Sequence, residues 1–324
     1  MKTSLPLAVF LISLFLAACR PVTAPAPTAA PAEAPVDAAA PSTTPVVLTA
    51  QQLVAKIPVG RSPHRIAVGE NGVWVTNEED DTVSRIDPQT NQVVATIPVG
   101  DYPRSLAVGF GSVWIGNNDA GTLSRIDPAT NEIIATIPVA PGTRGITAGP
   151  DAIWAASGQN GTVFRIDPAT NEIIATIDVG DNPAQMVALE NGIWVTNRGS
   201  NALTRIDPKT NSVGATIDLG CTTIGLAADA AATWAACEDD GTLFRIDPST
   251  NEITAKVPIG VNSYAIALGP DGVWVTSDLE NTLTLVDPST NTVARVYQLG
   301  LGALGLAVGD GAVWVAIRHE NSVW

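Results

Sequence analysis

The sequence predicts an all-β fold, a seven-bladed β-propeller with four antiparallel strands in each blade. Three observations lead to this prediction: a tryptophan that returns every 40 residues, an Asp-Pro pair on the same spacing, and short β-rich runs between them. The tryptophans are Trp74, Trp114, Trp154, Trp194, Trp234, Trp274 and Trp314. The Asp-Pro pairs begin at Asp87, Asp127, Asp167, Asp207, Asp247 and Asp287. Units of this length cannot bury their apolar faces alone, so they must pack against one another.

Each unit carries four strand signals separated by turn signals. In the first unit the expected strands cover residues 65–68, 72–76, 82–86 and 93–99. They are rich in Val, Ile, Thr and Trp, which favour strands. The turn at 87–91 has proline at its second position, which presets φ, and an aspartate whose side chain can accept backbone N–H groups. Four short strands repeated seven times are typical of a propeller.

The two ends of the repeat array predict how the ring closes. The last unit reaches Trp324, which occupies the repeat position of Ser84, so we expect a short third strand there and no fourth strand of its own; a truncated chain is the alternative. Residues 53–60 align with residues 93–100, the fourth strand of the first unit. We therefore expect the N-terminal strand to complete the last blade, which hides an edge and gives a propeller domain over residues 51–324.

The repeated residues are interpreted as scaffold. Six Asp-Pro copies spread around a rim cannot share one active site, and a repeated ion site is the alternative. Arginines such as Arg85 precede five of the aspartates by two residues and share their strand face, which predicts Arg–Asp pairing. The tryptophans are expected to pack blade against blade, with ligand binding as the alternative.

The N-terminal residues predict export. Residues 1–18 contain an apolar run too short to span a bilayer, and Leu16-Ala17-Ala18-Cys19 resembles the lipobox of bacterial lipoproteins. Cys19 is then the lipidated residue; an ordinary secretory signal is the alternative. Residues 19–50 are rich in Pro and Ala and predict a tether of up to about 90 Å at ~3.1 Å per residue. Arg20 favours the outer membrane, with the periplasm or cell surface as the site of action.

Composition excludes some partners. The formal net charge of −15 disfavours nucleic acid and anionic lipid head groups, so we expect membrane contact through the lipid anchor only. We also expect a monomer. No phosphate loop, nucleophile elbow, zinc-binding or redox motif occurs in the sequence, so no cofactor is predicted. Cys221 and Cys237 form an even pair in an oxidising compartment, on the same face of one blade, and are a candidate disulfide.

Two families resemble this chain. Trp74-Val75-Thr76-Asn77 and residues 194–197 resemble the namesake motif of the YVTN β-propellers, and residues 83–100 are close to that family's consensus. This resemblance covers residues 52–324 and implies an extracytoplasmic binding or surface protein. The chain is more distantly similar to the streptogramin (virginiamycin B) lyases, which use the same ring. That likeness implies a histidine base, a second histidine and two carboxylates that hold Mg²⁺.

The lyase pattern is incomplete in this sequence. The residues ten before each tryptophan, which start the inner strands, are His64, Arg104, Arg144, Ala184, Ile224, Tyr264 and Leu304. Leu304 stands where the resemblance implies the central histidine. Gly302 and Arg318 stand where it implies the metal carboxylates, and neither offers a side-chain oxygen to Mg²⁺.

Function is expected at the loop face around the channel mouth, where propellers usually take ligands. This face collects the ligand-binding candidates Arg61, His64, Arg104, Arg144, Arg198, Arg318 and His319. His64 and His319 are expected to be neighbours across the ring closure. The acidic run 78–81 is interpreted as a solvated loop, with Ca²⁺ binding as the alternative.

The hypothesis is a non-catalytic binding platform for an unknown protein or small anionic ligand, with a metal site not expected. The alternative is a carbon-oxygen lyase for a cyclic lactone-type substrate, with His64, His319 and Tyr264 as catalytic candidates and Mg²⁺ as its cofactor.

Overall fold

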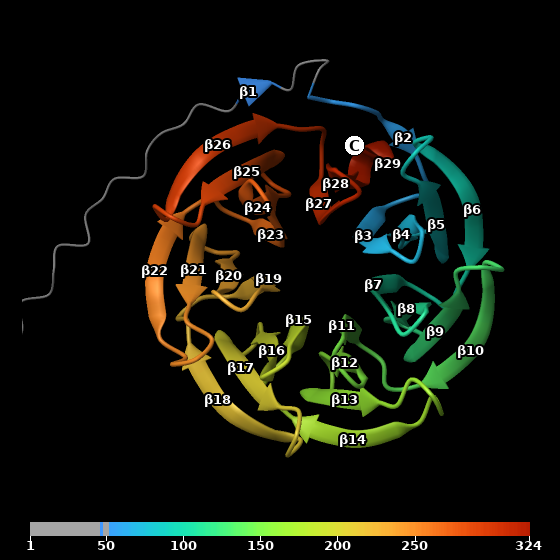
Figure 1. The fold of residues 1–324 in the computed structure, drawn as a ribbon, viewed down its shortest axis with the longest axis horizontal. Coiled ribbons are helices and arrows are strands. Elements are labelled where there is room, and N and C mark those ends of the chain that lie inside the picture. The colour runs from blue at the N-terminus through green and yellow to red at the C-terminus, as the bar shows by residue number, and fades with distance from the viewer. Residues whose placement is uncertain (1–45, 48–51) are drawn as a thin grey trace, which may run out of the picture. The chain divides into compact units, whose positions relative to one another are not determined.

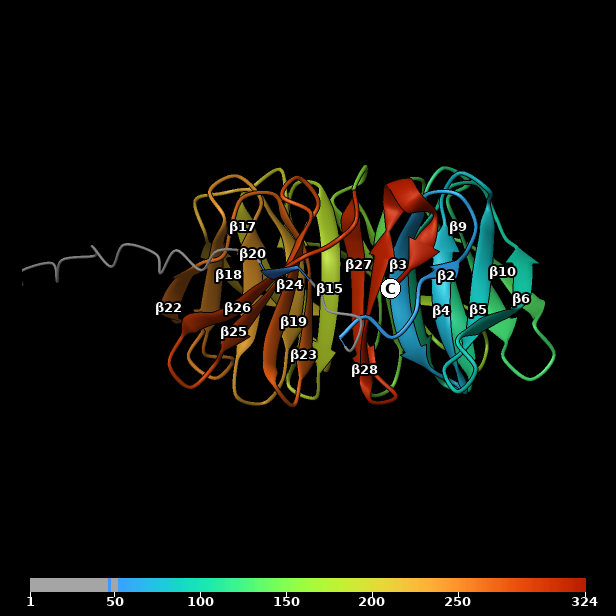
Figure 2. The ribbon, with the colours of Figure 1, turned by 90° about the horizontal axis from the view of Figure 1, so that it is seen from above.

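The structure is a computed structural model that describes residues 46–47 and 52–324. The expected signal peptide, Cys19 and the tether other than Val46–Val47 lie outside the described residues. Figure 1 shows seven sheets arranged around a central axis, and Figure 2 shows the strands running across the thickness of the ring. The predicted seven-bladed propeller with four antiparallel strands per blade is confirmed. Among the described residues, no helix has the length and hydrophobicity needed to cross a membrane.

The strands fall into four concentric sets. The inner strands are β3 (Pro63–Gly69), β7 (Pro103–Gly109), β11 (Thr143–Ala148), β15 (Pro183–Leu189), β19 (Thr223–Ala228), β23 (Ser263–Gly269) and β27 (Ala303–Gly309). The second strands are β4 (Gly72–Asn77), β8 (Ser112–Asn117), β12 (Ile153–Ser157), β16 (Gly192–Asn197), β20 (Thr233–Cys237), β24 (Gly272–Ser277) and β28 (Ala312–Ile317).

The third strands are β5 (Thr82–Asp87), β9 (Thr122–Asp127), β13 (Thr162–Ile166), β17 (Ala202–Asp207), β21 (Thr242–Ile246), β25 (Thr282–Asp287) and β29 (Ser322–Val323). The outer strands are β6 (Gln92–Pro98), β10 (Glu132–Pro138), β14 (Ile173–Asp178), β18 (Ser212–Asp218), β22 (Ile253–Pro258), β26 (Thr292–Gln298) and β2 (Ile57–Pro58). We number the blades 1 to 7 in the order of their inner strands.

The N-terminal strand closes the ring as expected. β2 pairs antiparallel with β29, with Ile57 opposite Val323, so blade 7 is built from both ends of the described chain. β29 has only two residues, which confirms the short third strand. Two short elements were not foreseen: β1 (Val46–Val47), which pairs in parallel with β26 at the rim of blade 6, and the 3₁₀ turn η1 (Arg318–Glu320).

The second strands form the core because each lies between two strands of its own sheet and between two neighbouring blades. Every residue of β4, β8 and β16 is buried. The tryptophans contact the next blade, as expected: Trp194 packs with Leu226 and Phe244 of blade 5, and Trp314 packs with Val73 of blade 1. The tryptophans are therefore architectural.

The asparagine of the Val-Thr-Asn motif has a local structural role. Asn77 Nδ2 donates to Thr82 Oγ1 at 3.0 Å and to Ser84 Oγ at 2.9 Å, which ties the second strand to the third. Asn117 makes the equivalent pair of hydrogen bonds in blade 2. The motif thus fixes the strand-to-strand connection.

The Asp-Pro turns hold their shape through their own polar groups. Asp87 Oδ1 accepts the Gln89 N–H at 2.8 Å, and the other five aspartates accept the equivalent N–H. The asparagine four residues later has positive φ in all six turns, which favours Asn among non-glycine residues. Its N–H bonds back to the carbonyl of the aspartate, as Asn91 does to Asp87 at 2.9 Å.

The predicted Arg–Asp pairing is wrong. The Arg85 guanidinium stacks 5.1 Å from the Trp74 ring and reaches the next blade, where Nη1 donates to the Pro128 carbonyl and to Asn131 Oδ1. The aspartate is already occupied by its own turn, so the arginine joins adjacent blades instead. The contact recurs from Arg125, Arg165, Arg205 and Arg245.

Candidate functional site

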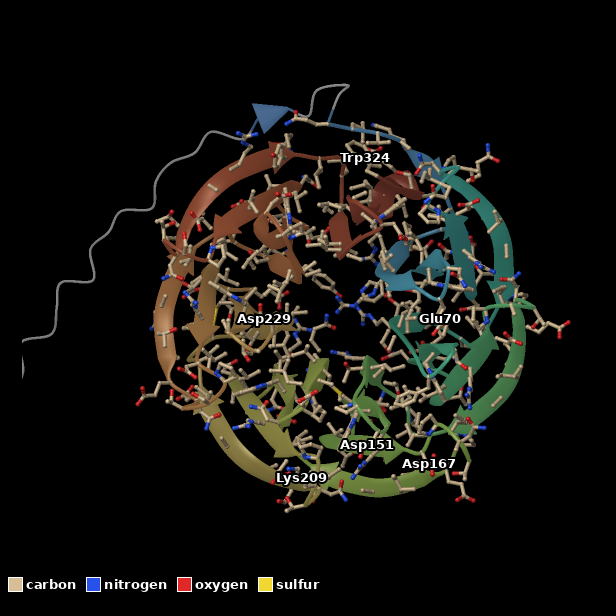
Figure 3. All side chains as sticks on the ribbon, in the orientation of Figure 1. Glu70, Asp151, Asp167, Lys209, Asp229 and Trp324 are labelled. Atoms are coloured by element: carbon tan, nitrogen blue, oxygen red, sulfur yellow. A yellow bond between two sulfur atoms is a disulfide. The ribbon has the colours of Figure 1, made fainter. Side chains whose placement is uncertain are left out.

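A cavity of about 230 Å³ opens at the central channel, at the starts of the inner strands. Pro63 of β3 pairs with Asn77 of β4, so inner-strand starts and second-strand ends share this edge. Side chains from several blades project toward the axis here (Figure 3). The lining residues are His64, Arg65, Arg104, Arg144, Ala184, Arg198, Ile224, Glu238 and Tyr264. Six of the seven expected inner-strand residues line the cavity; Leu304 is not among its lining residues.

His64 is held as a neutral imidazole. Its ring is 2% exposed, with Nδ1 3.1 Å from the Arg104 carbonyl oxygen and Nε2 2.7 Å from the Tyr264 hydroxyl. A carbonyl can only accept, so Nδ1 carries the proton and Nε2 accepts from Tyr264. Burial, followed by the charges of nearby arginines, lowers the pKa of His64 well below its ordinary value. The imidazole therefore stays uncharged at neutral pH.

The prediction of a solvated loop is wrong for Glu78. It is buried, not part of a solvated loop: its Oε1 lies 3.0 Å from Arg104 Nε and 3.4 Å from His64 Nε2, and its Oε2 lies 3.6 Å from Arg318 Nη2. Burial raises the pKa of Glu78, and the two arginines oppose that rise. The repeat contained the signal, because Glu78 occupies the position that Arg198 and Arg318 occupy in blades 4 and 7.

Four arginines line the cavity, and one of them, Arg65, was not predicted from the sequence. Arg65 is 9% exposed, and no hydrogen bond or ion pair of its guanidinium occurs within residues 52–324; its contact is the Tyr264 ring at 5.1 Å. Arg144 Nη1 donates to Asn182 Oδ1 at 3.3 Å. Arg198 pairs with Glu238 at 2.6 Å. Arg65 was missed because a bulge between Pro63 and Ile66 turns two successive residues toward the channel.

The remaining cationic candidates lie outside the lining. Arg61 is exposed and binds Asp80, with Nε 2.6 Å from Oδ1. Arg318 is not among the lining residues; its Nε donates to Ser62 Oγ at 3.0 Å, and its Nη2 lies 3.6 Å from Glu78 Oε2. His319 is exposed on η1, and within the described chain no hydrogen bond or ring contact joins it to His64. The expectation that the two histidines are neighbours stays a prediction.

The cavity has an excess of positive charge. Arg65, Arg104, Arg144 and Arg198 outnumber the nearby carboxylates Glu78 and Glu238. Burial, followed by the charges of Arg104 and Arg198, lowers the pKa of Arg144. Arginine stays protonated under such perturbation, so the charge persists. Ala184 and Ile224 give the opposite wall an apolar character. The arrangement suits a small anion with an apolar part.

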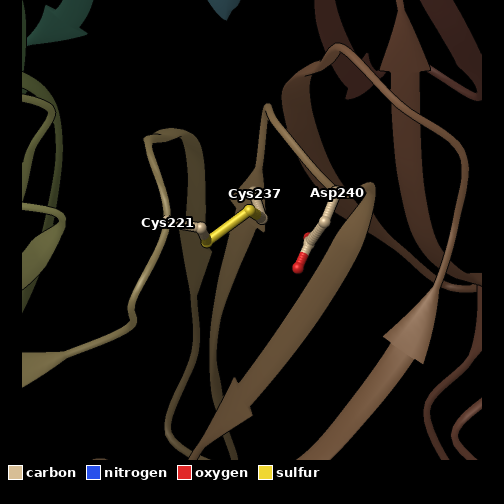
Figure 4. Close-up of side chains that lie close together, drawn as sticks. All are labelled: Cys221, Cys237 and Asp240. Carbon is tan, nitrogen blue, oxygen red and sulfur yellow. A yellow bond between two sulfur atoms is a disulfide. The ribbon is translucent and has the colours of Figure 1, made fainter.

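The residues do not fit the magnesium site that the lyase resemblance implies. Gly302 has no side chain, and Arg318 is a cation engaged with Ser62 and Glu78. In the part of the chain that the structure describes, the only group of three potential metal-ligating side chains is Cys221, Cys237 and Asp240 (Figure 4). The two cysteines are joined in a disulfide with their Cα atoms 5.9 Å apart, so their sulfurs are not free thiolates.

No protein-family model and no curated protein matches the sequence. The solved structures do give matches. A streptogramin B lyase aligns with a TM-score of 0.74 and 21% identity, over 83% of this chain and 95% of that chain. Hydrazine synthase from Kuenenia stuttgartiensis aligns with a TM-score of 0.72 and 15% identity, over 81% of this chain and 94% of that chain. At these identities the likeness establishes the propeller fold that the chain shares with both.

Proposed function

We propose that this protein is a lipid-anchored, extracytoplasmic β-propeller of the YVTN type that acts as a non-catalytic binding platform. Its ligand is a small anion, or an anionic group of a larger partner, bound in the cavity at the channel mouth. The Arg65 guanidinium carries the proposal: it is buried beside the cavity, no carboxylate within residues 52–324 forms an ion pair with it, and burial lowers its pKa more than the charge of Glu78 raises it. Burying a charge without a partner is costly, so an anionic ligand would relieve that cost.

Calorimetric titration of residues 52–324 with succinate and with inorganic phosphate tests this proposal, with succinamide as the uncharged control. We expect saturable binding of an anion, and weakening by about tenfold or more in Arg65→Gln, because a charge-assisted hydrogen bond is lost. Arg61→Gln is the matched control, since Arg61 lies outside the cavity and pairs with Asp80. Equal affinities in the two variants, or no saturation by either anion, would contradict the proposal.

The lyase remains the second candidate because of one observation. The neutral His64 imidazole presents an unprotonated Nε2, hydrogen-bonded to Tyr264, beside the cavity. That protonation state is the one a general base requires. Incubation with a streptogramin B antibiotic and Mg²⁺ distinguishes the two candidates: ring opening that His64→Ala abolishes would favour the lyase, and an intact antibiotic favours the platform.

Membrane attachment belongs to the same proposal and rests on the sequence around Cys19. In the full chain we expect Cys19→Ser to move the protein from the membrane fraction to the soluble exported fraction. A variant that stays in the membrane fraction would exclude the lipid anchor.

A further inference from the structure

The carboxylates at the channel cavity balance only two of its four arginines. Arg104 Nε lies 3.0 Å from Glu78 Oε1, and Arg198 Nη2 lies 2.6 Å from Glu238 Oε2. Neither of the other two lining arginines forms an ion pair within residues 52–324. The cavity therefore holds two positive charges that no carboxylate of the described chain pairs with, and such charges are costly to keep away from water.

These two arginines, Arg65 and Arg144, also retain unused hydrogen-bond donors. The Nε atom of each is buried and has no hydrogen-bond partner in the part of the chain that the structure describes. The Arg65 guanidinium lies 5.1 Å from the centre of the Tyr264 ring, and Arg144 uses Nη1 in a hydrogen bond of 3.3 Å to Asn182 Oδ1. A guanidinium offers five N–H donors in a planar fork that matches a carboxylate. Each arginine can therefore receive a carboxylate of its own.

The two arginines stand apart around the axis. Arg65 belongs to β3 of blade 1 and Arg144 to β11 of blade 3, with Arg104 of β7 between them, and Figure 1 shows these three inner strands in succession. Burial lowers the pKa of both arginines, and the charge of Arg104 lowers each further, so Arg104 is within electrostatic reach of both. A ligand that neutralises both therefore needs two separate anionic groups. A tetrahedral anion such as phosphate holds its charge at one centre.

The rest of the cavity limits what joins the two anionic groups. The volume of about 230 Å³ admits only a small molecule. Ala184 of β15 and Ile224 of β19 line the wall away from the arginines, and their side chains offer no hydrogen bond. A hydrocarbon linker suits such a wall, because removing apolar surface from water is favourable.

We propose that the channel cavity selects short dicarboxylates, with one carboxylate bound to Arg65 and the other to Arg144. The hydrocarbon chain between the carboxylates lies against Ala184 and Ile224. This inference rests on the proposed function and narrows it, because it requires two separate carboxylates where the proposed function requires one anionic group.

Calorimetric titration of the full chain tests the inference by comparing succinate, glutarate and adipate, each with its own monoamide. The monoamide keeps the skeleton and neutralises one carboxylate. We expect at least one dicarboxylate to bind about tenfold or more tightly than its monoamide, because the monoamide loses one charge-assisted pair with an arginine. Inorganic phosphate serves as the compact dianion and should bind more weakly than that dicarboxylate.

Three variants assign the preference to the second arginine. Arg144→Gln should reduce the preference for the dicarboxylate over its monoamide to about twofold or less, because the second carboxylate no longer meets a cation. Arg144→Lys keeps the positive charge and should keep most of the preference. Arg61→Gln is the matched control and should change nothing, since Arg61 is exposed and paired with Asp80. Circular dichroism verifies that the variants fold.

The outcomes separate this inference from the proposed function. Saturable binding of each dicarboxylate and its monoamide with equal affinity would overturn the inference and leave the proposed anion site standing. A preference that Arg144→Gln leaves unchanged, or phosphate binding more tightly than all three dicarboxylates, would do the same. Absent saturation by every anion tested would contradict both.

Discussion

His64 is the residue whose protonation depends most directly on the ring being intact. Its imidazole is surrounded by Arg65, Arg104, Arg318, Glu78 and Tyr264, and burial together with the arginines opposes its protonation. In the unfolded chain these groups separate and the imidazole titrates near its ordinary pKa of about 6.5. The folded state therefore binds fewer protons at this site than the unfolded state does in mildly acidic solution.

This difference predicts acid sensitivity. Because the folded pKa of His64 is lowered, its contribution to stability is present above about pH 6.5 and is lost as the pH falls toward the folded pKa, by up to about 1.4 kcal/mol per pH unit. His64→Gln removes that proton uptake. We expect the free energy of unfolding of the wild type to fall more steeply between about pH 7.5 and pH 5 than that of the variant, measured by urea denaturation. Parallel pH profiles would contradict the assignment of a neutral, buried His64.

Single residues also show where sequence reasoning succeeds and fails. The role of Asp87 was predictable, because an Asp-Pro turn is satisfied by local backbone groups. The partner of Arg85 was not, because it belongs to the next blade, 43 to 46 residues away. Glu78 looked like one of four acidic loop residues, and only the positions of Arg104 and Arg318 across two blade interfaces make it a buried ion-pair centre.

At the scale of elements, an Asp-Pro turn connects two strands of its own blade and also accepts hydrogen bonds from an arginine of the neighbouring blade. Asn131 adopts φ of 61° and its Oδ1 accepts from Arg85, so one side chain serves the turn and the interface. Asn91 has φ of 55°, but within residues 52–324 its Oδ1 receives no arginine. The two turns therefore separate the local role of the asparagine from its role between blades.

The difference between the Asn131 and Asn91 turns predicts different effects of the same substitution on the free energy of unfolding. Asn131→Gly should lower the free energy of unfolding by about 1–3 kcal/mol, because glycine tolerates the backbone but leaves the Arg85 guanidinium without a side-chain acceptor. Asn91→Gly should change it by less than about 0.5 kcal/mol. Both values come from urea unfolding monitored by circular dichroism. Equal losses in the two variants would mean that the turn, and not the arginine contact, accounts for the repeated asparagine.

At the scale of the whole molecule, the sequence predicts the features that the 40-residue repeat determines, and it does not predict the contacts of residues that are not repeated. The blade count, the strand order and the closure follow from a 40-residue spacing that each blade repeats. The cavity depends on how non-repeated side chains from different blades meet at the axis. Tyr264 of blade 6 bonds His64 of blade 1 past Leu304 of blade 7, a contact that requires the closed ring. Ring geometry was predictable, and pairings across the ring were not.

The closure itself gives the last prediction. Ile57 of β2 and Ile97 of β6 occupy the same repeat position and are 3% and 5% exposed, yet Ile57 belongs to a two-residue strand and Ile97 to a complete one. If the ring unfolds as one unit, either isoleucine-to-alanine change should cost about 2–5 kcal/mol in a single urea transition, because each creates a cavity in the same cooperative structure. If β2 detaches independently of the ring, Ile57→Ala would lower the free energy of unfolding by less than about 1 kcal/mol, while Ile97→Ala would keep its full effect. Equal costs would show that the joint between β2 and β29 unfolds together with the rest of the ring; a smaller cost for Ile57→Ala would refute that.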